Sequence, residues 1–281
     1  MKKKHSAPVR TTADKLYETG RAYYLSGDHE QAVTFFLRAA DEGHADAENC
    51  LGCCYEAGQG VGRDLKEAIN RYRHAAWHGN VYAQFNLGVA YAEGRGVERD
   101  AQAAFEWIRL SAQNGYALAQ HRAGLCCLAG FGTEKNSRTA AEWFRRAAAQ
   151  GDVQAMCDLG SCYFAGKGVE QNAGKAFRLF RAAAMKGCAE AMNNLGYCFR
   201  FGHGVRQSEK RAFRCFRAAA RRGCHGAEYN LGLCYATGHG TQKNADEALV
   251  WLERAARGGY RSATDILRQA GIIGAFRPSA D

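Results

Sequence analysis

The sequence predicts an all-α solenoid of about seven helix-turn-helix repeats with a 36-residue period, followed by a C-terminal capping helix. Three observations predict this fold. Glycine recurs at a fixed interval, apolar residues within each interval fall at helical spacing, and the 281 residues include two prolines against 33 glycines. Because proline interrupts helices, its scarcity favours a largely helical chain in which glycine marks the helix ends.

Three columns of small residues define the repeat. The phrase NLGYCFRFGHGV begins at Asn194 and returns as NLGLCYATGHGT from Asn230, 36 residues later. One glycine column comprises Gly52, Gly88, Gly124, Gly160, Gly196 and Gly232. A second glycine column comprises Gly43, Gly79, Gly115, Gly151, Gly187, Gly223 and Gly259, and an alanine column comprises Ala47, Ala83, Ala119, Ala155, Ala191, Ala227 and Ala263.

Each repeat is expected to form two helices. In the second repeat, Ala47, Leu51 and Tyr55 share one helical face, and GQG at 58–60 is expected to end that helix. Glycine inside a helix costs roughly 1 kcal/mol relative to alanine, so Gly52 and its equivalents predict a close approach of the two helices of a hairpin. A second apolar stripe follows, made of Ala68, Ile69, Tyr72, Ala75 and Ala76.

An N-cap column marks the start of every second helix. Its members have side-chain oxygens that can accept from a free backbone N–H: Asp28, Asp64, Asp100, Asn136, Asn172, Ser208 and Asn244. Gln31, Glu67 and Glu247 lie three residues after their caps and predict capping boxes.

The two ends of the chain depart from the repeat. Residues 13–44 form a first repeat whose loop is four residues shorter, and residues 1–12 are expected to be a disordered basic tail. Near the other end, Ser262–Gly271 repeats the first-helix pattern with Arg268 in the glycine column. That change predicts a capping helix over 261–274, with no partner helix to accommodate, and a tail over 275–281.

These residues resemble a known family. The phrase A-x(3)-L-G-x(2)-Y-x(2)-G-x-G-V, followed by an N-cap, is similar to the Sel-1-like repeat, a relative of the tetratricopeptide repeat with longer loops. Residues 13–44 look more like a plain tetratricopeptide repeat. The resemblance implies a right-handed α/α superhelix with the first helices lining its concave side, and a non-catalytic scaffold or adaptor role in protein–protein interaction. It covers six repeats, 45–80, 81–116, 117–152, 153–188, 189–224 and 225–260.

The candidate partner-binding groove lies on the first helices, opposite their apolar face. Resemblance to tetratricopeptide grooves implies that asparagines there bind a peptide backbone and that aromatic residues serve as apolar anchors. An alternative stays open, in which the asparagines bond to their own scaffold. The candidate residues are Asn49, Phe85, Asn86, Arg122, Asp158, Asn193, Asn194, Tyr197, Tyr229 and Asn230.

The net charge of +10 provides an alternative function. Residues 200–222 hold eight Arg or Lys and a single acid, Glu209, which predicts a patch for an acidic protein surface or RNA. For the arginines of the other second helices we favour a simpler interpretation, in which their stems lie along the apolar stripe. The core of the patch is Arg214, Arg217, Arg221 and Arg222.

No catalytic, cofactor or metal site is predicted, because P-loop, nucleophile-elbow and zinc spacings are all missing from the sequence. The twelve cysteines include a column that Ala22 and Ala90 share, a small position expected to be buried. Secreted cysteine-rich members of the resembled family, with β-lactam-related activity, form a second alternative. Their regular cysteine pair is missing here, so that activity is not carried over. The column is Cys54, Cys126, Cys162, Cys198 and Cys234.

A cytoplasmic location and a protein or peptide partner are expected. MKKKHSAPVR at the start has no apolar segment after its charges, which argues against export by a signal peptide. The sequence contains no run of about 18 apolar residues, so it predicts no membrane span. A reducing compartment would keep the cysteines as thiols.

Overall fold

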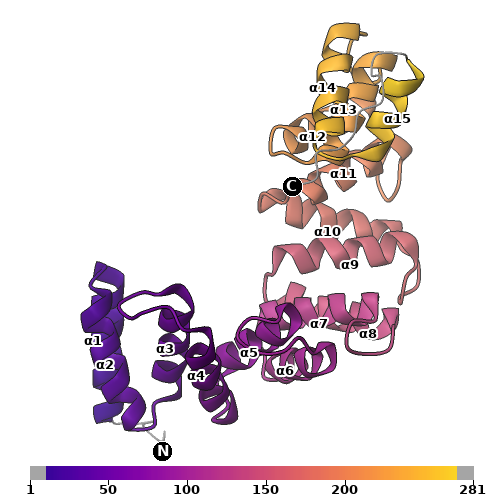
Figure 1. The fold of residues 1–281 in the computed structure, drawn as a ribbon. Coiled ribbons are helices and arrows are strands. Elements are labelled where there is room, and N and C mark those ends of the chain that lie inside the picture. Colours follow the sequence, from indigo (N-terminus) through magenta and orange to yellow (C-terminus); the bar gives the residue numbers. More distant parts are fainter. Residues whose placement is uncertain (1–10, 271–281) are drawn as a thin grey trace, which may run out of the picture. The chain divides into compact units, whose positions relative to one another are not determined.

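The chain is all-helical over residues 11–270, which are the residues that the computed structural model describes (Figure 1). This part divides after Asn136 into two compact units. The N-terminal unit contains α1 (Thr12–Ser26), α2 (His29–Asp41), α3 (Ala45–Ala57), α4 (Leu65–Trp77), α5 (Val81–Glu93), α6 (Ala101–Gln113) and α7 (Ala117–Ala129). The C-terminal unit contains α8 (Ser137–Ala149), α9 (Val153–Ala165), α10 (Ala173–Met185), α11 (Ala189–Phe201), α12 (Glu209–Ala220), α13 (His225–Thr237), α14 (Ala245–Arg257) and α15 (Arg261–Gln269).

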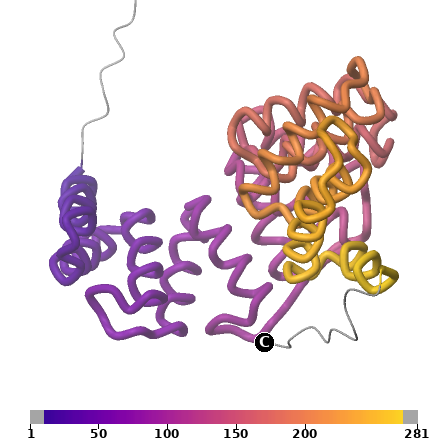
Figure 2. Tube along the Cα trace, turned by 90° about the horizontal axis from the view of Figure 1, so that it is seen from above, coloured from indigo at the N-terminus to yellow at the C-terminus, as the bar shows by residue number. Residues whose placement is uncertain are grey.

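Within each unit, helices that follow one another along the chain also pack against one another, as the tube in Figure 2 traces. First helices carry odd numbers and second helices carry even numbers. The first helices α3, α5, α9, α11 and α13 each pack between the second helices of their own and the preceding repeat. The predicted all-α solenoid of helical hairpins with a terminal helix is therefore confirmed.

The glycine column lets the two helices of a hairpin approach closely, as the sequence predicted. A Cβ added to Gly196 on α11 would lie 2.5 Å from a ring carbon of Phe216 on α12. The same addition at Gly160 would come within 2.7 Å of the Phe180 ring. Both rings are at most 2% exposed, so the side chain that fills the hairpin interior is packed directly on the backbone of its partner helix.

The loop between the two helices of a repeat is fixed at both ends. Gly58 ends α3 in the left-handed conformation, with φ of 71°, and donates its N–H to the Cys54 carbonyl. At the other end of the loop, the Asp64 side chain accepts from Glu67 N, and the Asp64 N–H donates to the Tyr55 carbonyl at 2.9 Å. The same pair of contacts recurs at Asp100, Asn172, Ser208 and Asn244.

These contacts correct the prediction of capping boxes. The backbone N–H of Asp64 already has a carbonyl acceptor on the preceding helix, so it does not need the Glu67 side chain. Glu67 instead accepts from Arg71 at 2.7 Å, and Glu247 accepts from Trp251 Nε1 at 2.9 Å. The N–H of Asp28 is likewise bonded to a backbone carbonyl.

The ends of the described chain are capped in different ways. Helix α1 begins at Thr12 with Thr11 as its N-cap, so these two residues belong to a helix and not to the predicted tail. At the other end, α15 packs Leu267, which is 1% exposed, against α14. The predicted tails at 1–10 and 275–281, and residues 271–274 of the predicted capping helix, lie outside the described residues.

We predict that Gly196→Ala lowers the free energy of unfolding by about 1–3 kcal/mol, because the new methyl group overpacks the Phe216 ring. The matched control is Gly174→Ala in the first turn of α10, where an added Cβ meets only Asn172 Oδ1 at 3.5 Å. That substitution should leave stability unchanged or raise it by up to about 1 kcal/mol, since alanine favours the helix. Urea unfolding followed by circular dichroism measures both, and equal effects would contradict the close approach.

We also predict that Asp100→Ala destabilises the protein by about 1 kcal/mol, because the Asp100 carboxylate accepts from Gln102 N and Ala103 N at 2.9 and 3.0 Å. Gln102→Ala on the same exposed turn is the control, since it leaves both of these hydrogen bonds in place. A thermal melt that fails to separate the two variants would contradict the capping role.

Candidate functional site

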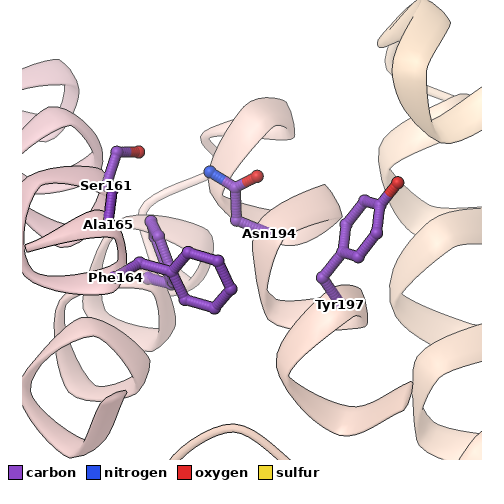
Figure 3. Close-up of a pocket in the computed structure, with 6 residues that line it drawn as sticks. Ser161, Phe164, Ala165, Asn194 and Tyr197 are labelled. Atoms are coloured by element: carbon purple, nitrogen blue, oxygen red, sulfur yellow. The ribbon is translucent and has the colours of Figure 1, made fainter. Parts of the chain in front are cut away.

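A cavity of about 330 Å³ lies between two neighbouring first helices of the C-terminal unit, α9 and α11 (Figure 3). Ser161 and Ala165 are exposed, so the cavity is open to solvent. Figure 3 shows the α9 side chains on one side and the α11 side chains on the other. The lining residues are Ser161, Phe164 and Ala165 of α9, Phe180 of α10, and Asn194 and Tyr197 of α11.

The cavity exists because of the glycine column. Because Gly160 has no side chain, the Phe180 ring of α10 reaches the backbone of α9. Phe180 therefore also lines the cavity. A Cβ added at Gly160 would lie 2.7 Å from the Phe180 ring, so a larger residue there would displace this lining side chain. The hairpin packing that stabilises the repeat therefore also shapes an apolar surface between repeats.

Polar and aromatic groups of α11 complete the cavity. The Asn194 amide donates one hydrogen bond, 3.8 Å long, to the Cys157 thiol, and its second N–H and its carbonyl have no hydrogen-bond partner among the described residues. Tyr197 packs edge-on against Phe216 at 5.8 Å and stacks on Phe201 at 5.9 Å. These contacts hold the Tyr197 ring in place, so the cavity offers apolar surface beside one amide.

The N-terminal unit repeats this cavity twice in the same register. In both cases the cavity is lined by the residues one, four and five positions after the first-helix glycine. The second-helix residue that packs on this glycine and residues of the next first helix complete the lining. One cavity, of about 290 Å³, is lined by Val89, Ala92, Glu93, Ile108, Arg122, Leu125, Cys126, Ala129 and Phe131. The other, of about 190 Å³, is lined by Arg21, Tyr24, Leu25, Phe36, Cys50 and Cys53.

The structure places three of the predicted groove residues around these cavities. Asn194 and Tyr197 line the cavity of the C-terminal unit, and Arg122 lines the larger cavity of the N-terminal unit. Asp158 is half-buried on α9. Tyr229 is half-buried on α13, where its ring lies 5.1 Å from that of Tyr260.

Other predicted groove residues bond to one another within the solenoid. Asn86 donates to Asn49 Oδ1 at 3.1 Å, and Asn230 donates to Asn193 Oδ1 at 2.9 Å, so each pair joins two successive first helices. The structure thus has these asparagines bonded to their own scaffold, which was the alternative interpretation. Asn230 is only 1% exposed, because its amide lies against the preceding repeat.

Phe85 also lies in the packed interior and not at the exposed surface where we expected an apolar anchor. Its side chain is 9% exposed and packs edge-on against Tyr116 of the following repeat at 5.4 Å. The two aromatic residues therefore fill space between α5 and the start of α7.

Sequence reasoning missed Phe164, Ala165 and Phe180 as lining residues. No sequence signal marked the first two, because the residue four positions after each first-helix glycine varies from Tyr24 to Ala92 and Phe164. Phe180 belongs to the apolar column of the second helices. This column predicts a core residue and does not reveal that one edge of the ring faces a cavity.

The predicted basic patch is exposed. Arg214, Arg217, Arg221 and Arg222 all lie on the surface of α12 and the turn after it. The Arg217 guanidinium lies 5.6 Å from the centre of the Phe213 ring, and Arg222 donates to the Ala218 carbonyl at 3.2 Å.

All twelve cysteines are free thiols, and eight of them are buried. Burial is the main cause that raises the pKa of each thiol above its ordinary value, to about 12 for Cys50 and about 11 for Cys54 and Cys198. The pKa rises for the same reason at the other nine thiols. Such thiols are poor nucleophiles near neutral pH. Ala22, in the same column as Cys54, is exposed, so the burial expected for this column does not hold in the first repeat.

Neither a metal-binding group nor a membrane-spanning helix occurs within residues 11–270. No three His, Cys, Asp or Glu residues in this part of the chain are grouped so that they could hold a metal ion. Among the described helices, none combines the length and the apolar character that crossing a membrane requires.

Comparison with known proteins identifies the repeat. A family model described as Sel1 repeat matches seven stretches, residues 13–44, 45–76, 81–116, 117–152, 153–188, 189–224 and 225–260. The first stretch, which we expected to resemble a plain tetratricopeptide repeat, is matched as a Sel1 repeat like the others. No curated protein matches the chain.

Two solved structures are similar over most of the chain. One is c5321, a protective antigen of uropathogenic Escherichia coli strains, with 33% identity over 94% of this chain and a TM-score of 0.81. This chain spans 57% of the length of that protein. The other is a Sel1 repeat protein from Oxalobacter formigenes, with 32% identity, coverage of 85% of this chain and 96% of that one, and a TM-score of 0.78.

We predict that the protein loses stability as the pH rises above about 9, the ordinary pKa of a thiol. Below that pH both states keep their thiol protons and stability is full. Between about 9 and 11 the unfolded chain loses protons that buried thiols such as Cys54 retain, so the unfolded state binds fewer protons and the free energy of unfolding falls. At pH 10 a buried thiol such as Cys54 should contribute a loss of about 1 kcal/mol.

The control removes the five thiols of the buried column, Cys54, Cys126, Cys162, Cys198 and Cys234, by substitution with the alanine that Ala90 already provides there. The difference in urea midpoint between pH 7.5 and pH 10 should shrink in this variant. An unchanged difference would mean that the thiols do not cause the alkaline loss.

Proposed function

This chain belongs to the Sel1 repeat family, and on that premise we propose that it is a non-catalytic scaffold that binds protein partners through the first-helix face of its repeats. The observation that carries the proposal is the cavity between α9 and α11, with an apolar floor at Phe180 and one amide at Asn194. An apolar side chain of a partner enters this cavity, and the partner's backbone bonds to Asn194.

The size of the cavity supports a side chain as its occupant. Pockets for small molecules measure about 300–1,000 Å³ and enclose most of their ligand. The cavity of about 330 Å³ is at the lower end of that range and is open to solvent through Ser161 and Ala165. A single apolar or aromatic side chain, presented by an extended peptide, suits this space better than an enclosed metabolite.

The register of the cavities supports recognition by several repeats. The cavities of the N-terminal unit lie at the same repeat position but have different linings, with Glu93 and Arg122 at one and two thiols at the other. Each cavity would accept a different side chain, so specificity would come from the order of the repeats. We place the scaffold in the cytoplasm, where its twelve thiols remain reduced.

We predict that Ser161→Trp blocks partner binding. Ser161 is exposed on α9 and faces the cavity, so an indole at this position fills the space without disturbing the core. Peptides of twelve residues are selected from a displayed random library on the wild-type protein, and their affinities are measured by fluorescence anisotropy. Selected peptides should share an apolar or aromatic anchor and bind the variant at least about tenfold more weakly, as expected for a lost hot spot.

The matched control is Val250→Trp, which adds the same indole at a 52% exposed position on α14 of the same unit. This variant should bind the selected peptides as the wild type does. Equal affinity of the peptides for the wild type and Ser161→Trp would reject the cavity as the binding site. Asn194→Ala should lower the affinity without changing the anchor residue that is selected.

A further inference from the structure

The outward face of α12 carries four cations in one line. Lys210, Arg214, Arg217 and Arg221 are spaced at i, i+4, i+7 and i+11, and all four are exposed. This spacing places them on one side of the helix. With a rise of about 1.5 Å per residue, the line is about 16 Å long.

These four cations have no carboxylate partner among the described residues. In contrast, some arginines of other second helices are paired with a carboxylate of the same helix: Arg109 with Glu106, Arg138 with Glu142, and Arg257 with Glu253. The one acid of α12, Glu209, lies 3.8 Å from His239 instead. The positive charge of α12 is therefore available to another molecule.

The repeat shows that this face is a local departure and not a property of the fold. Arg214 occupies a column that holds Glu106 in α6, Glu142 in α8 and Arg178 in α10. The corresponding line on α14 reads Asp246, Val250, Glu253 and Arg257, so its charges are mixed. Only α12, among the second helices of residues 11–270, has a cation at all four positions.

We propose that the outward face of α12 is a second interaction surface, which binds an acidic segment of a partner protein. Guanidinium groups pair with carboxylates through two parallel hydrogen bonds, and three of the four cations are arginines. Single-stranded nucleic acid would also need exposed aromatic rings on which bases stack. The rings of α12 do not serve that purpose, because Phe213 is 8% exposed and Phe216 is 0% exposed.

The test measures the binding of a fluorescein-labelled peptide of twelve residues rich in Asp and Glu, at 50 and 300 mM NaCl. The wild type should bind the peptide, and the higher salt concentration should weaken binding, because exposed charges are screened. Arg214→Glu should weaken binding about tenfold or more, since it removes one cation and the new carboxylate pairs with its neighbours Lys210 and Arg217. This variant should fold, because the repeat itself has glutamate in this column.

Arg73→Glu on α4 is the charge-matched control, since Arg73 is also an exposed arginine of a second helix. It should change the affinity less than about twofold. Failure of the wild type to bind the peptide, or an equal loss in Arg73→Glu, would overturn the proposal. Tighter binding of a twelve-nucleotide oligouridine that is lost in Arg214→Glu would assign the face to RNA and overturn it as well. Ser161→Trp should leave binding of the acidic peptide unchanged, so this test does not depend on the first-helix cavity.

Discussion

The contact on which the structure depends is the one between a first-helix glycine and the large side chain of its own second helix. At Gly196 and Phe216 the ring lies against backbone, so the two helices of the hairpin are closer than side chains on both would allow. Glycine inside a helix is unfavourable by roughly 1 kcal/mol. Burial of an aromatic side chain contributes about 1.5–3 kcal/mol and more than offsets that cost. Each hairpin thus gains a tightly packed interior and leaves its remaining apolar side for the next repeat.

The same contact determines where a partner can bind. Because Phe180 rests on Gly160, it lies deep between α9 and α11, and the space above it is bounded by side chains of two repeats. Binding positions of this kind belong to the junction of two repeats and not to either repeat alone. The outward face of α12 is independent of this packing, since its cations lie on the side of the helix away from the buried Phe216. One chain can therefore present an apolar surface on its first helices and a cationic surface on a second helix without compromising its core.

Most of the fold could be predicted from the sequence, because its determinants are local and repeated. Gly58 and Asp64 act within a few residues of their position in the chain, and their columns recur in every longer repeat. The sequence-based predictions that were wrong concern contacts between repeats or with backbone atoms. Asn230 and Phe85 have polar or exposed-looking helical positions, yet Asn193 and Tyr116 of neighbouring repeats cover them. The capping boxes failed because the Tyr55 carbonyl, which no sequence pattern reveals, already accepts from the N-cap. Asn194 and Tyr197 were candidates because they lie opposite the apolar stripe of their own helix, whereas Phe180 looked like any other core residue.

The doubly anchored loop has a consequence for how such a chain changes length. Gly58 closes α3 and the Asp64 N–H is bonded back to the Tyr55 carbonyl, so the residues between them form a closed backbone ring of defined size. An inserted or deleted residue would break that ring and rotate the next helix away from its neighbour. Duplication of a complete hairpin leaves this ring intact, and every such duplication adds one more junction whose lining is free to diverge.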